Sequence, residues 1–251
     1  MAWGYFEWRP YISVAERRRM AARHVDKLRR KGRAVAPIVV EGRAIAKTFW
    51  GKAWCANLEA YSDYANRLPR GRTYVRNGSV IDLQIEPGAV RALVCGSEIY
   101  ETDVDIAAVT ARRWRAIAAD CAGRIDSVVE LLAGKLAQGV MDRLCSRERG
   151  LFPAPSDIDF TCSCPDSARM CKHVAAVLYG IGARLDERPE LLFLLRKVDE
   201  KELIARAGEG LSRRPAPAGD VRVLGDDDTN LGAMFGIDIQ PSPKRTKRAR
   251  R

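Results

Sequence analysis

Four side chains that can bind a metal ion lie close together toward the C-terminal end of this chain. Cys162-Ser163-Cys164 is followed, after six residues, by Cys171-Lys172-His173. Thiolates combined with one imidazole select zinc, and four protein ligands leave a tetrahedral ion no open position for a substrate. The spacing therefore predicts a structural Zn2+ site with four ligands, which are Cys162, Cys164, Cys171 and His173.

Two other interpretations of these residues are open at this point. The cysteines can be ordinary core residues with His173 on a helix surface, or Cys171 can form a disulfide with Cys162 or Cys164. Both suit the sequence less well, because four ligands in this order are specific and nothing indicates an oxidising compartment. The remaining cysteines have no regular spacing and are expected to be packing residues; they are Cys55, Cys95, Cys121 and Cys145.

The four ligands need a strand and a helix to position them. Residues 158–161 alternate in polarity, which predicts a strand that carries Cys162 and Cys164 on one side and ends at Pro165. Further along, apolar residues at helical spacing predict a helix over about 171–184; they are Val174, Val177, Leu178 and Ile181. Cys171 should then precede the first helical turn, where free amides favour its thiolate, and His173 should lie within that turn.

The order Cys-x-Cys, spacer, Cys-x-His resembles the SWIM-type zinc finger, and the four ligands match it one for one. Residues 50–54 (WGKAW), 70–74 (RGRTY) and 151–153 (LFP) look like recurrent motifs of small bacterial SWIM-containing proteins. This chain has Cys95 where Gln is expected before Gly-Ser. The resemblance covers about residues 48–200. It implies a ββα-like finger for DNA or protein contacts, often beside helicase-like ATPases of the Swi/Snf type.

Length and composition limit the class of protein. A chain of 251 residues can hold one large domain or two small ones with a sizeable core. No apolar run approaches the roughly 18–20 residues that span a bilayer. The first residues also lack the layout of a signal peptide. We therefore expect a cytoplasmic protein without membrane contact, and the resemblance adds a bacterial setting in which it can associate with the nucleoid.

The net charge of +11 is concentrated at the two ends of the chain. Residues 1–50 contain twelve basic and four acidic side chains, and residues 244–251 contain six basic and no acidic ones. Residues 51–243 are left with a net charge of −3. Contacts with nucleic-acid phosphates are therefore expected mainly from the ends.

A basic helix is predicted at residues 13–33, with Ser13 as its N-cap and Gly32 as its stop. It carries nine basic residues from Arg17 to Arg33 and one acid, Asp26. Such a helix can neutralise phosphates, or it can be a solvated arm without a specific role. Candidate nucleic-acid contacts lie in this helix, in the loop at residues 67–72 and in the finger; they are Arg17, Arg18, Arg19, Arg23, Arg29, Arg30, Arg70, Arg72, Arg169 and Lys172.

The middle of the chain predicts helices and a β-meander. A helix over residues 49–66 places two tryptophans, Trp50 and Trp54, on a core face rather than on a base-stacking platform. Asn77-Gly78 predicts a hairpin between strands at 73–76 and 79–85, and two more strands follow at 90–95 and 100–106. Asp82 is expected on the outer face of this meander. Two helices, around 110–122 and 125–147, are expected to cover one face of the sheet.

The predicted fold class is α+β, an antiparallel β-meander covered by helices and followed by a small ββα-like zinc-binding module. Residues 1–47 form a basic N-terminal arm and helix, and residues 48–150 an α+β domain. Residues 151–204 form the SWIM-type finger with C-terminal helices. Residues 205–251 form a disordered tail with a basic end, in which residues 231–239 are a candidate docking segment.

Two functions are compatible with these residues. The first is a nucleic-acid-associated zinc-finger protein that binds DNA or assists DNA-processing machinery. The second is a protein-interaction module that docks a Swi/Snf-type helicase-like ATPase or a recombination factor, with no direct DNA contact by the finger. The slightly acidic middle and the apolar residues 191–195 favour the second. We expect no enzyme and no small-molecule substrate, because phosphate-binding glycine loops, HExxH and deaminase signatures are all absent from the sequence.

Overall fold

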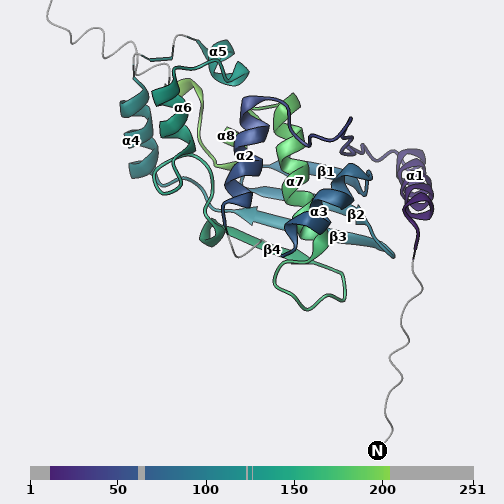
Figure 1. The fold of residues 1–251 in the computed structure, drawn as a ribbon. Helices are drawn as coiled ribbons and strands as arrows, with labels where there is room; N and C mark the ends of the chain where they lie inside the picture. The colour runs from purple at the N-terminus through teal and green to yellow at the C-terminus, as the bar shows by residue number, and fades with distance from the viewer. Residues whose placement is uncertain (1–11, 62–65, 123, 126, 204–251) are drawn as a thin grey trace, which may run out of the picture. The chain divides into compact units, whose positions relative to one another are not determined.

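A four-stranded antiparallel sheet in the order β1-β2-β3-β4 organises the computed structural model (Figure 1). The structure describes residues 12–61, 66–122, 124–125 and 127–203. The predicted tail at 205–251, with its segment 231–239, lies outside them. The strands are β1 (Val80–Glu86), β2 (Ala89–Cys95), β3 (Ile99–Ile106) and β4 (Ile158–Cys162). An antiparallel sheet combined with helices confirms the predicted fold class.

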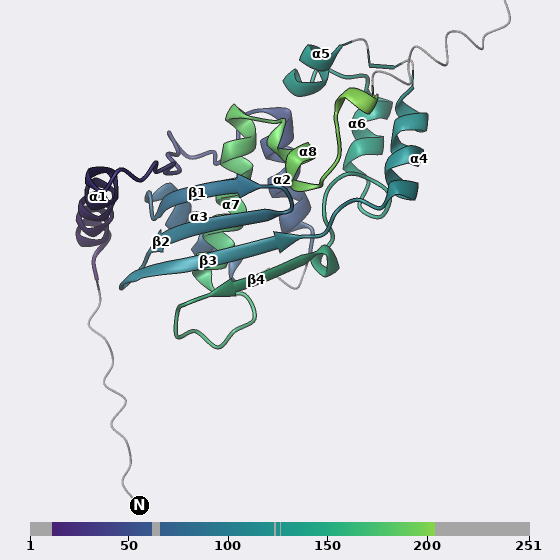
Figure 2. The ribbon, with the colours of Figure 1, turned by 180° about the vertical axis from the view of Figure 1, so that it is seen from behind.

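Helices cover one face of this sheet. Three of them, α2, α3 and α7, lie on that face, whereas α1 packs against β1 and β2 at one end of the sheet (Figures 1 and 2). The helices are α1 (Val14–Arg30), α2 (Phe49–Glu59), α3 (Leu68–Arg76), α4 (Ala111–Cys121), α5 (Val128–Ala133), α6 (Gln138–Cys145), the 3₁₀ turn η2 (Pro155–Asp157), α7 (Lys172–Glu187) and α8 (Leu191–Leu195). No helix in the described parts of the chain is long and apolar enough to cross a bilayer.

Helix α7 is the central element of the core. The sequence predicted a single apolar stripe along it, but every residue from His173 to Gly182 is buried. The small residues between the large ones, such as Ala175 and Gly180, let neighbouring elements approach α7 from several sides. A helix that is apolar all round belongs in the interior. One continuous cluster of buried side chains accordingly joins α7 to α2, α3, the sheet and α8.

Two glycines explain why α2 and α3 can lie so close to α7. A Cβ atom built on Gly51 of α2 would come within 2.5 Å of the Gly182 carbonyl oxygen. A Cβ built on Gly71 of α3 would lie 2.6 Å from the Ala175 carbonyl carbon. A Cβ atom does not fit at such distances, so both positions suit glycine. The WGKAW and RGRTY motifs therefore have a packing role, with Trp50 and Trp54 buried on the same side.

The strand of the finger is part of the main sheet. β4 pairs with β3 over five residue pairs, from Thr102 opposite Cys162 to Ile106 opposite Ile158. The sequence predicted a separate ββα-like module after residue 150, but the buried core is continuous across that boundary. The finger consists of an edge strand, a loop and the central helix of the same fold.

Residues 73–76 are helical, so the strand predicted there is wrong. They form the last turn of α3, which begins beside Pro69 in the first helical turn. Asn77 caps the helix and Gly78 follows with φ 69°, so Asn-Gly acts as a helix stop rather than as a hairpin turn. Leu68, Gly71 and Val75 lie on the buried face, and this burial favours the helix over the strand.

Three helices, rather than the two predicted, lie between residues 110 and 147, and they do not cover the sheet. Gly134 adopts φ 65° and ends α5, so the predicted second helix is broken into α5 and α6. In both views α4 and α6 lie beside each other beyond the end of the strands (Figures 1 and 2). Their buried residues, such as Trp114, extend the core toward Phe193 of α8.

Asp82 is buried, although the sequence predicted it on a solvated face. Its side chain is 1% exposed and accepts hydrogen bonds from the backbone N–H of Ala36 at 2.9 Å and from Gln84 at 2.8 Å. Arg33 forms an ion pair with it at 3.3 Å. An irregularity in the pairing between Val80 and Asp82 shifts the alternation of the strand. Asp82 therefore holds the segment that follows α1 against the sheet.

The predicted basic helix is present as α1. The Ser13 hydroxyl accepts a hydrogen bond from the backbone N–H of Glu16 at 3.1 Å, and Gly32 has φ 76°, so both predicted ends are confirmed. Only one residue of α1, Ala21, is buried. It contacts a small second cluster on the opposite face of the sheet, formed by Ile81, Leu93 and Cys95.

Candidate metal centre

The four predicted ligands come from the end of β4 and the start of α7. β4 ends at Cys162, and Cys164 lies in the bend that follows, so the strand stops two residues earlier than predicted. Cys171 is the N-cap of α7, and His173 lies in its first turn, as the sequence predicted. The loop between them is tied to the start of α3 by an ion pair of Arg67 with Asp166 at 3.6 Å.

The ligand atoms are close enough together to hold one ion. One atom from each of the four residues lies within 4.8 Å of the others. The Nδ1 atom of His173 is 3.8 Å from the Sγ atoms of both Cys162 and Cys171. Zn–S bonds of about 2.3 Å and Zn–N bonds of about 2.0 Å require tetrahedral ligand atoms roughly 3.5–3.8 Å apart. The donor set and the spacing both fit zinc.

The thiols of the cluster differ in their pKa values. A hydrogen bond from Cys171, followed by smaller ones from His173 and Thr102, lowers the pKa of Cys162 to about 3 against the effect of burial. The same contact with Cys162, together with burial, raises the pKa of Cys171. Cys162 therefore ionises readily to a thiolate, and its negative charge opposes ionisation of the neighbouring thiols. A cation among the sulfurs removes that repulsion.

Neighbouring groups orient the sulfur ligands. The Thr102 hydroxyl, on the β3 residue paired with Cys162, donates to its Sγ at 3.4 Å. The backbone N–H of Val174 donates to the Sγ of Cys171 at 3.5 Å. Between Cys162 and Cys164, Ser163 exchanges two hydrogen bonds of 3.0 Å with the backbone of Glu101. These outer contacts hold the thiolates in place, as is usual for protein zinc sites.

His173 is fixed by two aromatic rings and one glycine. Tyr100 stacks on its imidazole with ring centroids 4.5 Å apart, and Tyr74 contacts its edge at 5.4 Å. Its Nε2 atom is buried and has no hydrogen-bond partner among the described residues. A Cβ built on Gly96 would lie 2.6 Å from that Nε2 atom. The ring is thus packed so that Nδ1 faces the sulfurs.

Replacing Gly96 by Ala is expected to weaken zinc binding by about 10- to 100-fold, the range typical of changes just outside the ligand set. The added methyl group would displace the imidazole or the Tyr100 ring, which it would approach to 2.7 Å. Competition with a chromophoric chelator measures the affinity. Tyr100→Phe is the matched control, because it keeps the stacked ring and removes only the hydroxyl contact with Ser97. Unchanged affinity in Gly96→Ala would contradict this role for Gly96.

The other four cysteines lie outside the cluster. Cys95 and Cys121 are fully buried, as expected for packing residues. Burial also raises the pKa of Cys55 to about 12 and that of Cys145 to about 11. These thiols stay protonated at neutral pH, which distinguishes them from Cys162.

Two of the candidate nucleic-acid contacts, Arg17 and Lys172, lie against one aromatic ring. The guanidinium of Arg17 on α1 lies 4.5 Å from the centre of the Tyr74 ring, and the Lys172 ammonium of the finger lies 5.7 Å from it. Arg70 is exposed one turn before Tyr74 on α3. Tyr74 in turn contacts His173. The structure therefore brings one cation of α1 and one of the finger together next to the metal centre.

Several other candidates are placed differently. Arg72 is on a helix rather than in a loop, and it is engaged by Glu59 and by the Tyr179 hydroxyl at 3.0 Å. Arg18 donates two hydrogen bonds to Asn77. The remaining candidates are exposed on α1 or in the finger loop; they are Arg19, Arg23, Arg29, Arg30 and Arg169.

Three residues of the site were missed in the sequence, namely Gly96, Tyr100 and Thr102. All three belong to the β2–β3 hairpin, about sixty positions before the ligands. Their only local signal was the Gly96-Ser97 turn. Their role follows from the pairing of β3 with β4, which the sequence did not predict.

A strand end and a helix start that bring together three cysteines and one histidine are the arrangement of a zinc finger. Residues 159–180 match the family model of the SWIM zinc finger, and this segment is a SWIM zinc finger. The match spans the whole ligand set, from the β4 residue before Phe160 to the middle of α7. The resemblance predicted from the ligand spacing is thereby confirmed.

The chain is also similar to the uncharacterized protein Rv2102 of Mycobacterium tuberculosis (strain ATCC 25618 / H37Rv). The two are 34% identical over 180 residues, which cover 70% of this chain and 65% of that protein. The similarity therefore spans somewhat less than two thirds of the relative. No solved structure matches the chain.

Proposed function

We propose that the centre holds one structural Zn2+ ion and that the protein associates with nucleic acid through the finger and α1 together. The donor set, the 3.8 Å spacings and the buried imidazole support the choice of zinc. Bound there, the ion would link β4 to the start of α7 and would have no open position for catalysis. The protein is therefore proposed to be a binding protein rather than an enzyme.

The nucleic-acid proposal rests on the surroundings of the Tyr74 ring. Two different elements each place one cation near this ring. Arg17 belongs to α1 and Lys172 to the finger, so the two basic regions present one surface. The Nε atom of Arg17 is buried without a partner among the described residues, and Lys172 makes no ion pair there. Cations that are held in place but not neutralised are suited to phosphate groups.

The second candidate, docking of a helicase-like ATPase, loses one of its supports. Residues 191–195 suggested an apolar docking surface, but four of these five side chains are buried in the protein's own core. Only Leu194 is exposed, at 38%. We therefore place nucleic acid first.

Replacing Arg70 and Lys172 together by Gln is expected to weaken binding to a DNA duplex and to lower the slope of log K against log salt by about 2, since each lost phosphate contact removes about 0.9. Fluorescence anisotropy over a salt series measures both. The matched control replaces Arg112 and Arg149 by Gln. Both are exposed; Arg112 lies on α4, and Arg149 follows α6. Zinc content of the double variant should be unchanged, because neither residue is a ligand.

A different result would assign the finger to protein contacts. If the Arg70 and Lys172 variant kept the full salt slope while removal of both basic ends abolished binding, the finger would not touch DNA. The two basic ends would then supply the affinity alone.

A further inference from the structure

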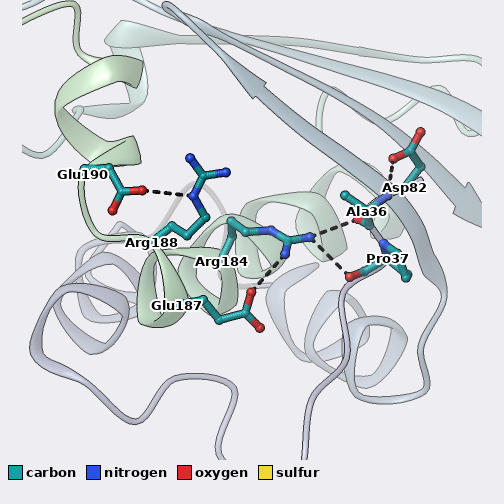
Figure 3. A network of polar contacts seen from close by, with 7 residues as sticks. All are labelled: Ala36, Pro37, Asp82, Arg184, Glu187, Arg188 and Glu190. Carbon is teal, nitrogen blue, oxygen red and sulfur yellow. Dashed lines mark hydrogen bonds and ion pairs between the residues drawn. The ribbon is translucent and has the colours of Figure 1, made fainter. Parts of the chain in front are cut away.

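At the β1 edge, the sheet is extended by a segment that is not one of the four strands. Residues 36–38 run antiparallel alongside β1, with hydrogen bonds of 3.0 Å from Ile38 N–H to the Val80 carbonyl and from Leu83 N–H to the Ala36 carbonyl. Figure 3 shows how the segment is held on both sides. Asp82 binds the Ala36 N–H at 2.9 Å, and Arg184 of α7 donates to the carbonyls of Ala36 and Pro37 at 3.0 and 3.2 Å.

A groove lies between this segment and α1. Its volume is about 480 Å³. Apolar side chains from both walls and from β1 line most of it; they are Ala21, Ala22, Val25, Pro37, Ile38, Val39, Val40 and Ile81. Asn77 and Gly78 also line it, and Arg18 bridges α1 to Asn77. The groove is therefore lined mostly by apolar side chains.

The wall formed by the segment offers an unpaired backbone edge. Successive backbone groups of an extended chain point to opposite sides. Since the groups of Ala36 and Ile38 face β1, those of Val39 face away from it. Within the described residues, neither the N–H nor the carbonyl of Val39 has a hydrogen-bond partner. Its side chain is 70% exposed, so an apolar group accompanies the unpaired backbone edge.

The rim of the groove is positively charged. Three arginines and one acid, Asp26, lie along it, which gives a net charge of +2. Arg29 and Arg76 are exposed and form no side-chain hydrogen bond or ion pair with the described residues, whereas Arg18 is engaged by Asn77. An occupant with alternating apolar and acidic side chains would match the apolar lining and the rim at once.

We propose that this groove binds an extended peptide of a partner protein in which apolar residues alternate with acidic ones. The peptide adds to the sheet as a strand beside residues 36–40, accepts a hydrogen bond from the Val39 N–H and donates one to the Val39 carbonyl. Its apolar side chains contact the apolar lining, and its carboxylates pair with Arg29 and Arg76. This inference does not rest on nucleic-acid binding by the finger.

The test uses the full chain and a synthetic, labelled peptide that alternates valine with aspartate. Val39→Pro removes one donor that has no partner in the described structure, so the thermal midpoint should not change, while peptide binding should weaken at least about tenfold. Pro at 39 also favours an extended conformation at Ile38, which the segment already needs. Equal binding by Val39→Pro and the unmodified chain would overturn the strand addition.

Charge reversal tests the choice of occupant. Replacing Arg29 and Arg76 together by Glu should abolish binding of the aspartate peptide and create binding of a peptide that alternates valine with lysine. The control pair Arg112→Glu and Arg149→Glu should bind like the unmodified chain. No detectable binding of either peptide to any form would overturn the proposal. So would a loss of duplex DNA binding in Val39→Pro, because the groove would then be a nucleic-acid site.

Discussion

Replacing Cys164 by Ala is expected to release the metal ion and to lower the thermal midpoint of the protein by about 8–16 °C. An ion present at about 1,000 times its dissociation constant stabilises the folded state by about 4 kcal/mol, and each kcal/mol is worth about 2–4 °C in a domain of this size. His173→Ala should act in the same way, because both residues belong to the four-atom cluster. Elemental analysis and calorimetry, with and without a chelator, measure the two effects.

The control for this prediction is Cys145→Ala. Cys145 is partly buried outside the cluster, and burial keeps its thiol protonated. This variant should keep one metal ion per chain and should respond to a chelator as the unmodified protein does. A full equivalent of zinc in Cys164→Ala, or a loss of zinc in Cys145→Ala, would mean that the ligands are wrongly assigned.

Replacing Gly71 by Ala is expected to cost about 3 kcal/mol or more of the free energy of unfolding, at the upper end of the range for overpacking. The new methyl group would lie 2.5 Å from the Cβ of Ala175 and 2.6 Å from its carbonyl carbon. Backbone atoms of a central helix cannot move aside as a side chain can, so α3 must shift away from α7. Tyr74 would move with it and leave the edge of His173, so zinc affinity should fall as well.

Gly139→Ala is the matched control for this variant. Gly139 lies in the first turn of α6, and the nearest atom to an added Cβ is 3.8 Å away on Arg124. With no clash, the substitution should stabilise the protein by about 0.4–1 kcal/mol, because alanine loses less chain entropy on folding. Denaturant unfolding measures both variants. Equal stability of Gly71→Ala and the unmodified chain would contradict the close contact between α3 and α7.

The parts that could be predicted from the sequence were those with a local cause. The four metal ligands follow from residue type and spacing. The ends of α1 follow from Ser13 and Gly32, which act through neighbouring backbone groups. The buried face of α2 follows from the period of Trp50 and Trp54. Strands β1 to β3 follow from short alternating segments between turns.

The parts that were missed depend on contacts between distant residues. Residues 73–76 have the composition of a strand, but burial of Val75 against α7 makes them helical. The central position of α7 depends on small residues that let other elements approach closely. Gly71 of α3 approaches Ala175 of α7 in this way, and the role of each residue depends on the other. The environment of His173 depends on Gly96 and Tyr100 in another hairpin. Pairing between β3 and β4 spans more than fifty residues, and no local pattern encodes it.

The pairing of β4 with β3 means that the finger cannot be excised and studied by itself. A fragment that ended before residue 158 would expose the hydrogen-bonding edge of β3 and leave α2 and α3 without α7. A fragment containing only the finger would lack Thr102 and Tyr100, which orient two of its ligands. Single substitutions in the intact chain, rather than truncations or grafts, are therefore the means of separating metal binding from the proposed surface recognition.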